Sequence, residues 1–283
     1  MQTATPAARA AVPARAVPQR RVSRPRVMGE GSSSAISVVT VLGLFALWWV
    51  ATAERWIPAL FLPSPPAIWA AFVQSIAGGG NGAPLLDNIG WSLFRVISAF
   101  ILAVLVGVPT GLAMGTSRIA RGIFDPPIEF YRPLPPLAYL PLIIIWFGIG
   151  EVSKVLLIFL ACFAPVALSA RSGVRSVSQE QVNAAFSMGA SRSQVVRHVI
   201  MPAALPDILV GLRIGMGVGW TTLVAAEMVA ATAGLGQMVL NASNFLRTDV
   251  VIMGIIVIGL FAYAFEMGMR QLEKRLVPWK GKV

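Results

Sequence analysis

The sequence has few charged residues: Asp, Glu, Lys and Arg make up 12% of its 283 residues, whereas 56% are hydrophobic. A soluble globular domain carries roughly 25% charged residues, so this chain lacks the polar side chains that would cover a water-soluble protein of its size. The apolar residues also occur in long blocks, and a membrane-spanning helix needs about 20 of them in succession. We therefore predict an all-α integral membrane protein.

Residues that build metal centres and catalytic triads are almost absent. The sequence has one cysteine, Cys162, inside an apolar run, and one histidine, His198. A lone cysteine forms no internal disulfide, and a histidine without neighbouring thiols or carboxylates builds no metal site. The sequence also lacks the G-x-x-x-x-G-K-[ST] loop that binds nucleotide phosphates. We expect no catalytic residue, no metal, no bound cofactor and no ATP hydrolysis on this chain.

Acidic residues are outnumbered, since 23 Lys and Arg against 12 Asp and Glu give a net charge of +11. A nucleic-acid-binding protein would gather its basic residues on a soluble face. Here they lie at the ends of the apolar blocks, the distribution that orients a membrane protein. We therefore expect contact with a lipid bilayer and not with nucleic acid.

Residues 1–34 are rich in Pro, Ala and Arg and lack an apolar period, which predicts a disordered, basic cytoplasmic tail. A pair of arginines at 20–21 also occurs in export signals, but the apolar block that follows is long enough to span and has no clear cleavage site. We divide the rest into a first transmembrane helix with a periplasmic connector (35–84), a core of further spans (85–275) and a cytoplasmic tail (276–283).

Six apolar blocks predict six transmembrane helices. The third is short and follows a proline-rich stretch, so we expect it to begin inside that stretch. Membranes tolerate such broken backbone inside protein or beside a cavity. A short amphipathic segment is expected near Ile68–Ile76. The predicted spans are Ala35–Ala53, Val96–Met114, Leu137–Ile149, Val155–Ala170, Ile208–Ala231 and Val250–Met267.

Six spans place both termini on the same side of the membrane. With the termini inside, the inner segments contain most of the Lys and Arg, whereas the outer segments contain Arg55, Lys154 and Arg247. Arg95 and Arg213 lie at span edges. Because cytoplasmic loops carry an excess of basic residues, we predict that both termini are cytoplasmic.

The inner segment between the fourth and fifth spans, residues 171–207, has the pattern of two short helices. The S-x-x-Q spacing of a capping box occurs at Ser178–Gln181 and again at Ser191–Gln194. Between them, Gly189 is suited to the left-handed conformation that ends a helix, and Pro202 is expected to end or kink the second helix. Such a helix–glycine–helix loop either completes the bundle or forms a rigid docking site for another protein.

Three runs in this loop resemble the EAA motif of ABC-importer permeases. They are Asn183-Ala184-Ala185, Gly189-Ala190-Ser191 and Val199-Ile200-Met201-Pro202. Asn183 stands where the family has Glu, and Met201 stands where it has Leu. The spacing and the placement between late spans match the family, and the resemblance extends over roughly residues 85–275.

The resemblance implies an ABC type I importer (MetI-like) permease in a bacterial inner membrane, with residues 85–275 as the permease core. In that family the EAA helices sit in a cleft of a cytoplasmic ATPase subunit, which binds ATP and Mg. A homodimer of permeases works with two such ABC ATPase subunits and a periplasmic substrate-binding protein. The implied ATPase-coupling residues are Asn183, Ala184, Ala185, Gly189, Ala190, Ser191 and Pro202.

Longer runs are similar to the nitrate/sulfonate/taurine permease subfamily, and within it most similar to taurine permeases. They cover Tyr131–Leu142, Ile145–Glu151 and Gly217–Glu227. The resemblance implies import of taurine or a related small sulfonate, with nitrate, bicarbonate or another alkanesulfonate as the alternative. An ion-driven secondary transporter, the class outside this family, usually shows internal repeats and charges inside the membrane that couple to an ion. The sequence holds no second helix–glycine–helix loop, and we expect no charged network around Glu227.

Four residues of the fifth span are candidates for the translocation path: Trp220, Thr221, Thr222 and Glu227. An ionisable group at membrane depth is costly and is a functional candidate by default. A carboxylate there would meet the ammonium group of taurine. The alternative is that Glu227 lies at the outer water boundary or pairs with a neighbour.

Small residues also recur in the fifth span, at Gly211, Gly215 and Gly219. A stripe of glycines four residues apart lets two helices approach closely, so we expect packing against another helix. Arg213 is expected to extend its guanidinium group to the membrane interface.

Overall fold

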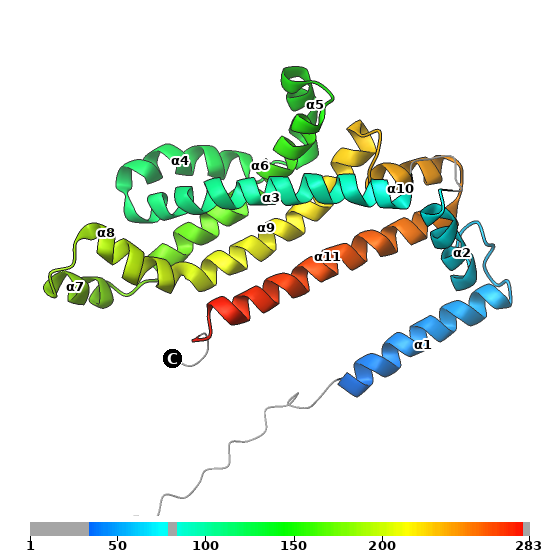
Figure 1. The fold of residues 1–283 in the computed structure, drawn as a ribbon, viewed down its shortest axis with the longest axis horizontal. Coiled ribbons are helices and arrows are strands. Elements are labelled where there is room, and N and C mark those ends of the chain that lie inside the picture. Colours follow the sequence, from blue (N-terminus) through cyan, green and yellow to red (C-terminus); the bar gives the residue numbers. More distant parts are fainter. Residues whose placement is uncertain (1–33, 79–83, 280–283) are drawn as a thin grey trace, which may run out of the picture. The chain divides into compact units, whose positions relative to one another are not determined.

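A computed structural model describes residues 34–78 and 84–279, and every regular element in these ranges is a helix (Figure 1). The chain divides after Leu47 into two compact units. Residues 34–47 form the first part of α1 (Ser34–Ala53), and the remainder of α1 belongs to the second unit. The predicted N-terminal tail, up to residue 33, and the last residues of the C-terminal tail lie outside the described residues.

The second unit contains the remaining helices. They are α2 (Pro65–Ile76), α3 (Leu85–Thr116), α4 (Arg118–Tyr131), α5 (Pro136–Phe147), α6 (Glu151–Arg175), α7 (Gln179–Ser187), α8 (Arg192–Val195), the π-helical turn η1 (Val196–Ile200), α9 (Met201–Ala230), α10 (Leu235–Asn244) and α11 (Thr248–Leu276).

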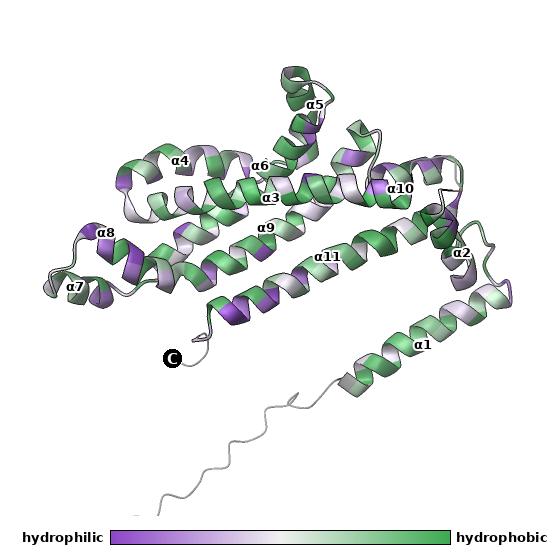
Figure 2. Cartoon of the chain, viewed as in Figure 1, coloured by the Kyte–Doolittle hydropathy of each residue, from purple (hydrophilic) through white to green (hydrophobic). Residues whose placement is uncertain are grey.

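Among the described residues, five helical stretches are long and apolar enough to cross a membrane, and a sixth span results if the bent pair α4 and α5 counts as one. The predicted spans therefore coincide with helices, except that two of them run one or two residues past the ends of α5 and α9. Helices α3, α6, α9 and α11 extend beyond the predicted spans. Figure 2 shows hydrophilic residues in α7, in α8 and at the C-terminal end of α11, whereas the middle of α3 and of α11 is hydrophobic. The helix ends are polar where the sequence predicts that they leave the bilayer.

The third predicted span is interrupted, as expected. Helices α4 and α5 meet at 107° across a break that contains Pro133 and Pro135. Proline has no N–H to continue a helix, and with 14 and 12 residues neither helix alone reaches the roughly 20 residues of a full span. The sequence analysis did not predict that α4 is helical, because Pro126 and Pro127 lie inside it.

Helices α3, α6 and α9 form the core of the second unit and approach one another through glycines. A Cβ atom added at Gly107 of α3 would lie 2.9 Å from Cγ1 of Val166, and one at Gly215 of α9 would lie 3.1 Å from Cγ2 of the same residue. One at Gly219 would lie 2.8 Å from Sγ of Cys162. Because both glycine faces contact α6, the predicted packing role of the glycines in the fifth span is confirmed.

A separate apolar cluster joins α2, α3, α10 and α11. Helix α2 confirms the short segment expected near residue 68, whereas α10 was not predicted. Figure 1 places α10 at the end of the bundle opposite α7 and α8. The buried residues of the cluster are Ile68, Ala71, Leu85, Leu235, Ala242, Val250, Met253 and Val257.

Candidate functional site

Helix α7 ends in a glycine turn. Gly189 has φ of +83°, in the left-handed region that favours glycine. The N–H of Ala190 donates to the carbonyl of Ala185 at 3.1 Å, and the N–H of Gly189 donates to the carbonyl of Phe186 at 2.9 Å. These two bonds form a Schellman motif, so the predicted glycine stop is confirmed.

One of the two predicted capping boxes forms. The Ser191 hydroxyl accepts from the N–H of Gln194 at 3.4 Å, and Oε1 of Gln194 accepts from the N–H of Ser191 at 2.8 Å. The box predicted at Ser178–Gln181 is wrong, because the Ser178 hydroxyl accepts instead from the N–H of Glu180 at 3.2 Å. Ser178 still caps α7, through the second helical residue instead of the third.

The second helix of the loop does not end at Pro202. Helix α8 continues through η1 into α9, and Arg192–Ala230 is one stretch of 39 residues. A proline ring crowds the carbonyl four residues earlier and supplies no N–H. The irregularity before Pro202 takes the form of a π-helical turn, which widens the helix without breaking it. The loop and the fifth span are therefore continuous.

Most of the predicted coupling residues lie on the surface of this loop. Exposed are Asn183, Ala184, Gly189, Ser191 and Pro202, while Ala190 is half-buried and Ala185 is buried.

The tip of the loop also exposes an apolar side chain. Met188, next to Gly189, is 82% exposed. Beside it lies a hollow of about 370 Å³ whose lining includes Ala185, Gln194 and His198. Exposed apolar side chains beside a hollow are typical of a protein contact surface. The contact with an ATPase remains a prediction.

At the opposite end of the bundle, charged side chains of both signs form a cluster in which Arg95, Lys154 and Glu227 are buried and Glu151 is 36% exposed. Arg95 of α3 is 1% exposed and donates from Nη1 to Glu227 of α9 at 2.7 Å. Its Nε and Nη2 donate to Glu151 of α6 at 2.5 and 2.9 Å, and Lys154 donates to Glu151 at 2.8 Å. The two positive and two negative charges cancel, which lowers the cost of placing them inside an apolar bundle.

Both carboxylate oxygens of Glu227 accept hydrogen bonds inside this cluster. The group is 0% exposed, and its two oxygens accept from the Ser92 hydroxyl at 2.7 and 3.0 Å. Oε2 also accepts from the N–H of Gly236 at 2.8 Å. The structure thus gives Glu227 the paired arrangement of the alternative interpretation and leaves it no surface at which to meet a substrate.

The connection between α9 and α10 covers the cluster. Arg95 Nη1 donates to the carbonyl of Ala233 at 2.7 Å, and the N–H of Gly234 donates to Oδ1 of Asn88 at 2.8 Å. Gly234 has φ of +136°, and an added Cβ would lie 2.5 Å from Cδ of Glu227. A glycine is required there by both conformation and space.

Sequence reasoning missed this cluster. It placed Arg95 at a span edge and Lys154 in an outer segment, and its expectation that no charged network surrounds Glu227 is wrong. The available signal was the presence of opposite charges near the outer ends of three apolar blocks. The free-energy cost of placing such charges at membrane depth is lower when they pair with each other inside the bundle.

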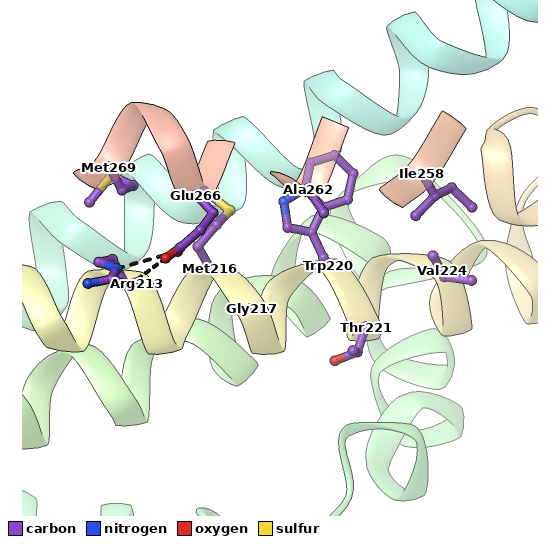
Figure 3. A pocket seen from close by; sticks show the side chains of 10 residues that line it. All are labelled: Arg213, Met216, Gly217, Trp220, Thr221, Val224, Ile258, Ala262, Glu266 and Met269. Carbon is purple, nitrogen blue, oxygen red and sulfur yellow. Dashed lines mark hydrogen bonds and ion pairs between the residues drawn. The ribbon is translucent and has the colours of Figure 1, made fainter. Parts of the chain in front are cut away.

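Two of the path candidates line a cavity of about 540 Å³ between α9 and α11 (Figure 3). Trp220 and Thr221 lie there together with Arg213 and Glu266. Thr222 is buried and does not line the cavity. Arg213 pairs with Glu266 and Glu273 of α11, and its predicted place at the membrane interface stays a prediction. Of the four candidates, Trp220 and Thr221 thus line this cavity, from different sides of α9, whereas Thr222 and Glu227 do not line it.

Comparisons with known proteins were made for the whole chain. The family model described as "Binding-protein-dependent transport system inner membrane component" matches residues 103–278. The chain is 55% identical over 250 residues to the taurine transport system permease protein TauC of Escherichia coli (strain K12), covering 88% of this chain and 90% of that protein. It is 34% identical over 238 residues to the putative aliphatic sulfonates transport permease protein SsuC of the same strain, covering 84% and 89%.

A solved structure shares the fold. A chain of the inward-facing MetNI methionine ABC transporter matches with a TM-score of 0.60 and 17% identity, over 75% of this chain and 99% of that chain. Together with the all-helical architecture, this likeness confirms the predicted MetI-like fold.

Proposed function

The chain belongs to the family of binding-protein-dependent transport system inner membrane components, and on that premise we propose that it is the permease through which an ATP-driven importer moves taurine. The substrate rests on one observation, the 55% identity to a taurine permease over 88% of the chain. The 34% identity to a permease for aliphatic sulfonates supports the sulfonate class. The chain is a multi-pass protein of the inner membrane.

In this proposal the loop around Gly189 is the contact with a separate ATPase subunit. Its two capped helix starts and its Schellman turn make it rigid, and Met188 gives it an exposed apolar tip. A rigid contact transmits movement that a flexible loop would absorb. The partner ATPase binds ATP and Mg, and this chain contributes Asn183, Ala184, Ala185, Gly189, Ala190, Ser191 and Pro202 to the contact.

The remaining partners follow from the same proposal. Two copies of this chain form the path as a homodimer, two ATPase subunits drive it, and a periplasmic binding protein delivers taurine. Because α8, η1 and α9 are continuous, movement of the loop reaches the helix that carries Trp220 and Thr221.

The test is uptake of labelled taurine by the complete complex in a strain without other taurine importers. We expect ATP-dependent uptake that unlabelled taurine competes away better than nitrate, bicarbonate or simple alkanesulfonates. Preferred nitrate uptake would overturn the substrate. Uptake that persists without the ATPase subunit and follows an ion gradient would overturn the importer class.

A further inference from the structure

The cavity between α9 and α11 contains a hydrogen-bond donor without a partner. Among the described residues, Nε1 of the buried Trp220 has no hydrogen-bond acceptor. Buried polar groups are nearly always hydrogen-bonded, so each exception calls for an explanation. In Figure 3 the ring nitrogen lies on the side of the indole that faces Glu266. Nε1 itself is covered by neighbouring atoms, so a ligand in the cavity supplies the missing acceptor once the indole ring turns toward it.

An ion pair lies in the same cavity. Arg213 donates to Glu266 from Nη2 and, at 3.4 Å, from Nε, and both side chains are 30% exposed. Each has a further partner, because Arg213 Nη1 lies 3.3 Å from Glu273 and Arg270 Nε lies 2.8 Å from Glu266. The pair can therefore open without leaving either charge alone.

We propose that this cavity is a transit site for a zwitterionic aminosulfonate, an inference that rests on the proposed function. The sulfonate binds the guanidinium group of Arg213 and accepts from Trp220 Nε1, and the ammonium group donates to Glu266. Guanidinium groups bind oxyanions through paired N–H donors, and hydrogen bonds between ionised partners are strong. One substrate thereby satisfies both halves of the ion pair and the free indole N–H.

The ion pair also suits transport, in which binding must be weak enough to allow release. Without substrate, Arg213 and Glu266 neutralise each other, so a zwitterion exchanges one set of ion pairs for another. The volume of about 540 Å³ lies in the range of roughly 300–1,000 Å³ of small-molecule sites. The apolar lining from Met216, Val224 and Ile258 suits the carbon segment of such a substrate. A lipid acyl chain would fill that part but would leave the indole N–H without an acceptor.

The test uses the complete complex in liposomes, with saturating taurine-loaded binding protein, and measures the taurine moved per ATP hydrolysed. Trp220→Phe keeps an aromatic ring and removes the N–H. We expect the ratio of taurine moved to ATP hydrolysed to fall about threefold to tenfold, because one hydrogen bond to the substrate is lost. Glu266→Gln lowers it further, while Glu266→Asp, which keeps the carboxylate, lowers it less. Trp146→Phe, at an exposed position of α5, is the matched control and leaves the ratio unchanged.

The outcomes separate the two proposals. A wild-type complex that moves no taurine would contradict both the proposed function and the transit site. A wild-type complex that moves taurine, with Trp220→Phe and Glu266→Gln at the wild-type ratio, would overturn the transit site alone. Uptake and ATP hydrolysis that fall in proportion would also overturn it, because that pattern indicates a folding role for these side chains.

Discussion

Nη1 of Arg95 lies 2.7 Å from Oε1 of Glu227, and the two side chains are 1% and 0% exposed. The contact joins α3 to α9, residues 132 positions apart in the sequence. Burying either charge alone is costly, so each depends on the other and on Glu151, which also pairs with Lys154. The pair fastens the helix that starts the core to the helix that continues into the loop around Gly189.

Replacing one member of this pair is expected to destabilise the protein strongly. Glu227→Gln leaves the charge of Arg95 partly uncompensated in a buried site, at a cost of about 3–5 kcal/mol. The melting temperature of the purified complex in detergent measures the effect. Glu129→Gln is the control, because its exposed pairs with Arg132 and Arg171 are 3.9 Å long and contribute at most about 1 kcal/mol. Equal melting temperatures for the two variants would contradict the role of the cluster.

The double replacement Arg95→Met with Glu227→Leu is expected to cost less than the sum of the single replacements. The single variants each leave a buried charge, whereas the double variant removes both and leaves Glu151 paired with Lys154. Unfolding of all four proteins in one denaturant series gives the coupling free energy. Strict additivity would show that Arg95 and Glu227 act independently.

Gly189→Val is expected to weaken both taurine uptake and stimulation of the ATPase. The backbone at φ of +83° disfavours a β-branched residue by about 1–2 kcal/mol, which opens the turn. Gly189→Asn should retain more activity, because asparagine tolerates the left-handed region. Within the described residues, a Cβ at Gly189 has no atom within 4 Å, so the effect is one of backbone conformation. Full activity of the valine variant would rule out a conformational requirement.

Gly234→Ala is expected to lower the yield and melting temperature of the complex. Its Cβ would enter the space of the Glu227 carboxylate, and its backbone has φ of +136°. Gly259→Ala in α11 is the matched control, since no described atom lies within 4 Å of a Cβ there and alanine favours a helix by roughly 0.5–1 kcal/mol. Similar behaviour of both variants would show that the connection between α9 and α10 is not fastened through Glu227.

The sequence predicted the features that depend on composition and on local backbone. The spans can be predicted from apolar blocks, because a segment inside a bilayer must hydrogen-bond all of its backbone groups internally and a helix does so. The turn at Gly189 follows from a conformation that a single residue type favours. Both capping boxes had the same spacing, yet only Ser191 formed one, because the local backbone decides which N–H reaches the serine hydroxyl.

Contacts between side chains far apart in the sequence could not be predicted from composition and local backbone. The partners of Arg95 lie on other helices, and no spacing in the sequence connects them. The cavity that contains Trp220 and Arg213 likewise depends on how α11 packs against α9. Of the two outcomes predicted for Pro202, a helix end or a kink, the helix end is wrong. A π-helical turn accommodates the proline, and nothing in the sequence distinguishes that outcome from a helix end.

Arg192–Ala230 is one continuous helical stretch that connects the two ends of the bundle. At 1.5 Å per residue its 39 residues are about 58 Å long, from just after the Gly189 turn to the buried cluster. Between these ends the glycine face of α9 packs against α6, and at the far end Glu227 is bonded to α3 and to the start of α10. A displacement of the loop therefore acts on a helix that close packing and a buried ion pair hold in place, so it must be transmitted to α3 and α6 as well.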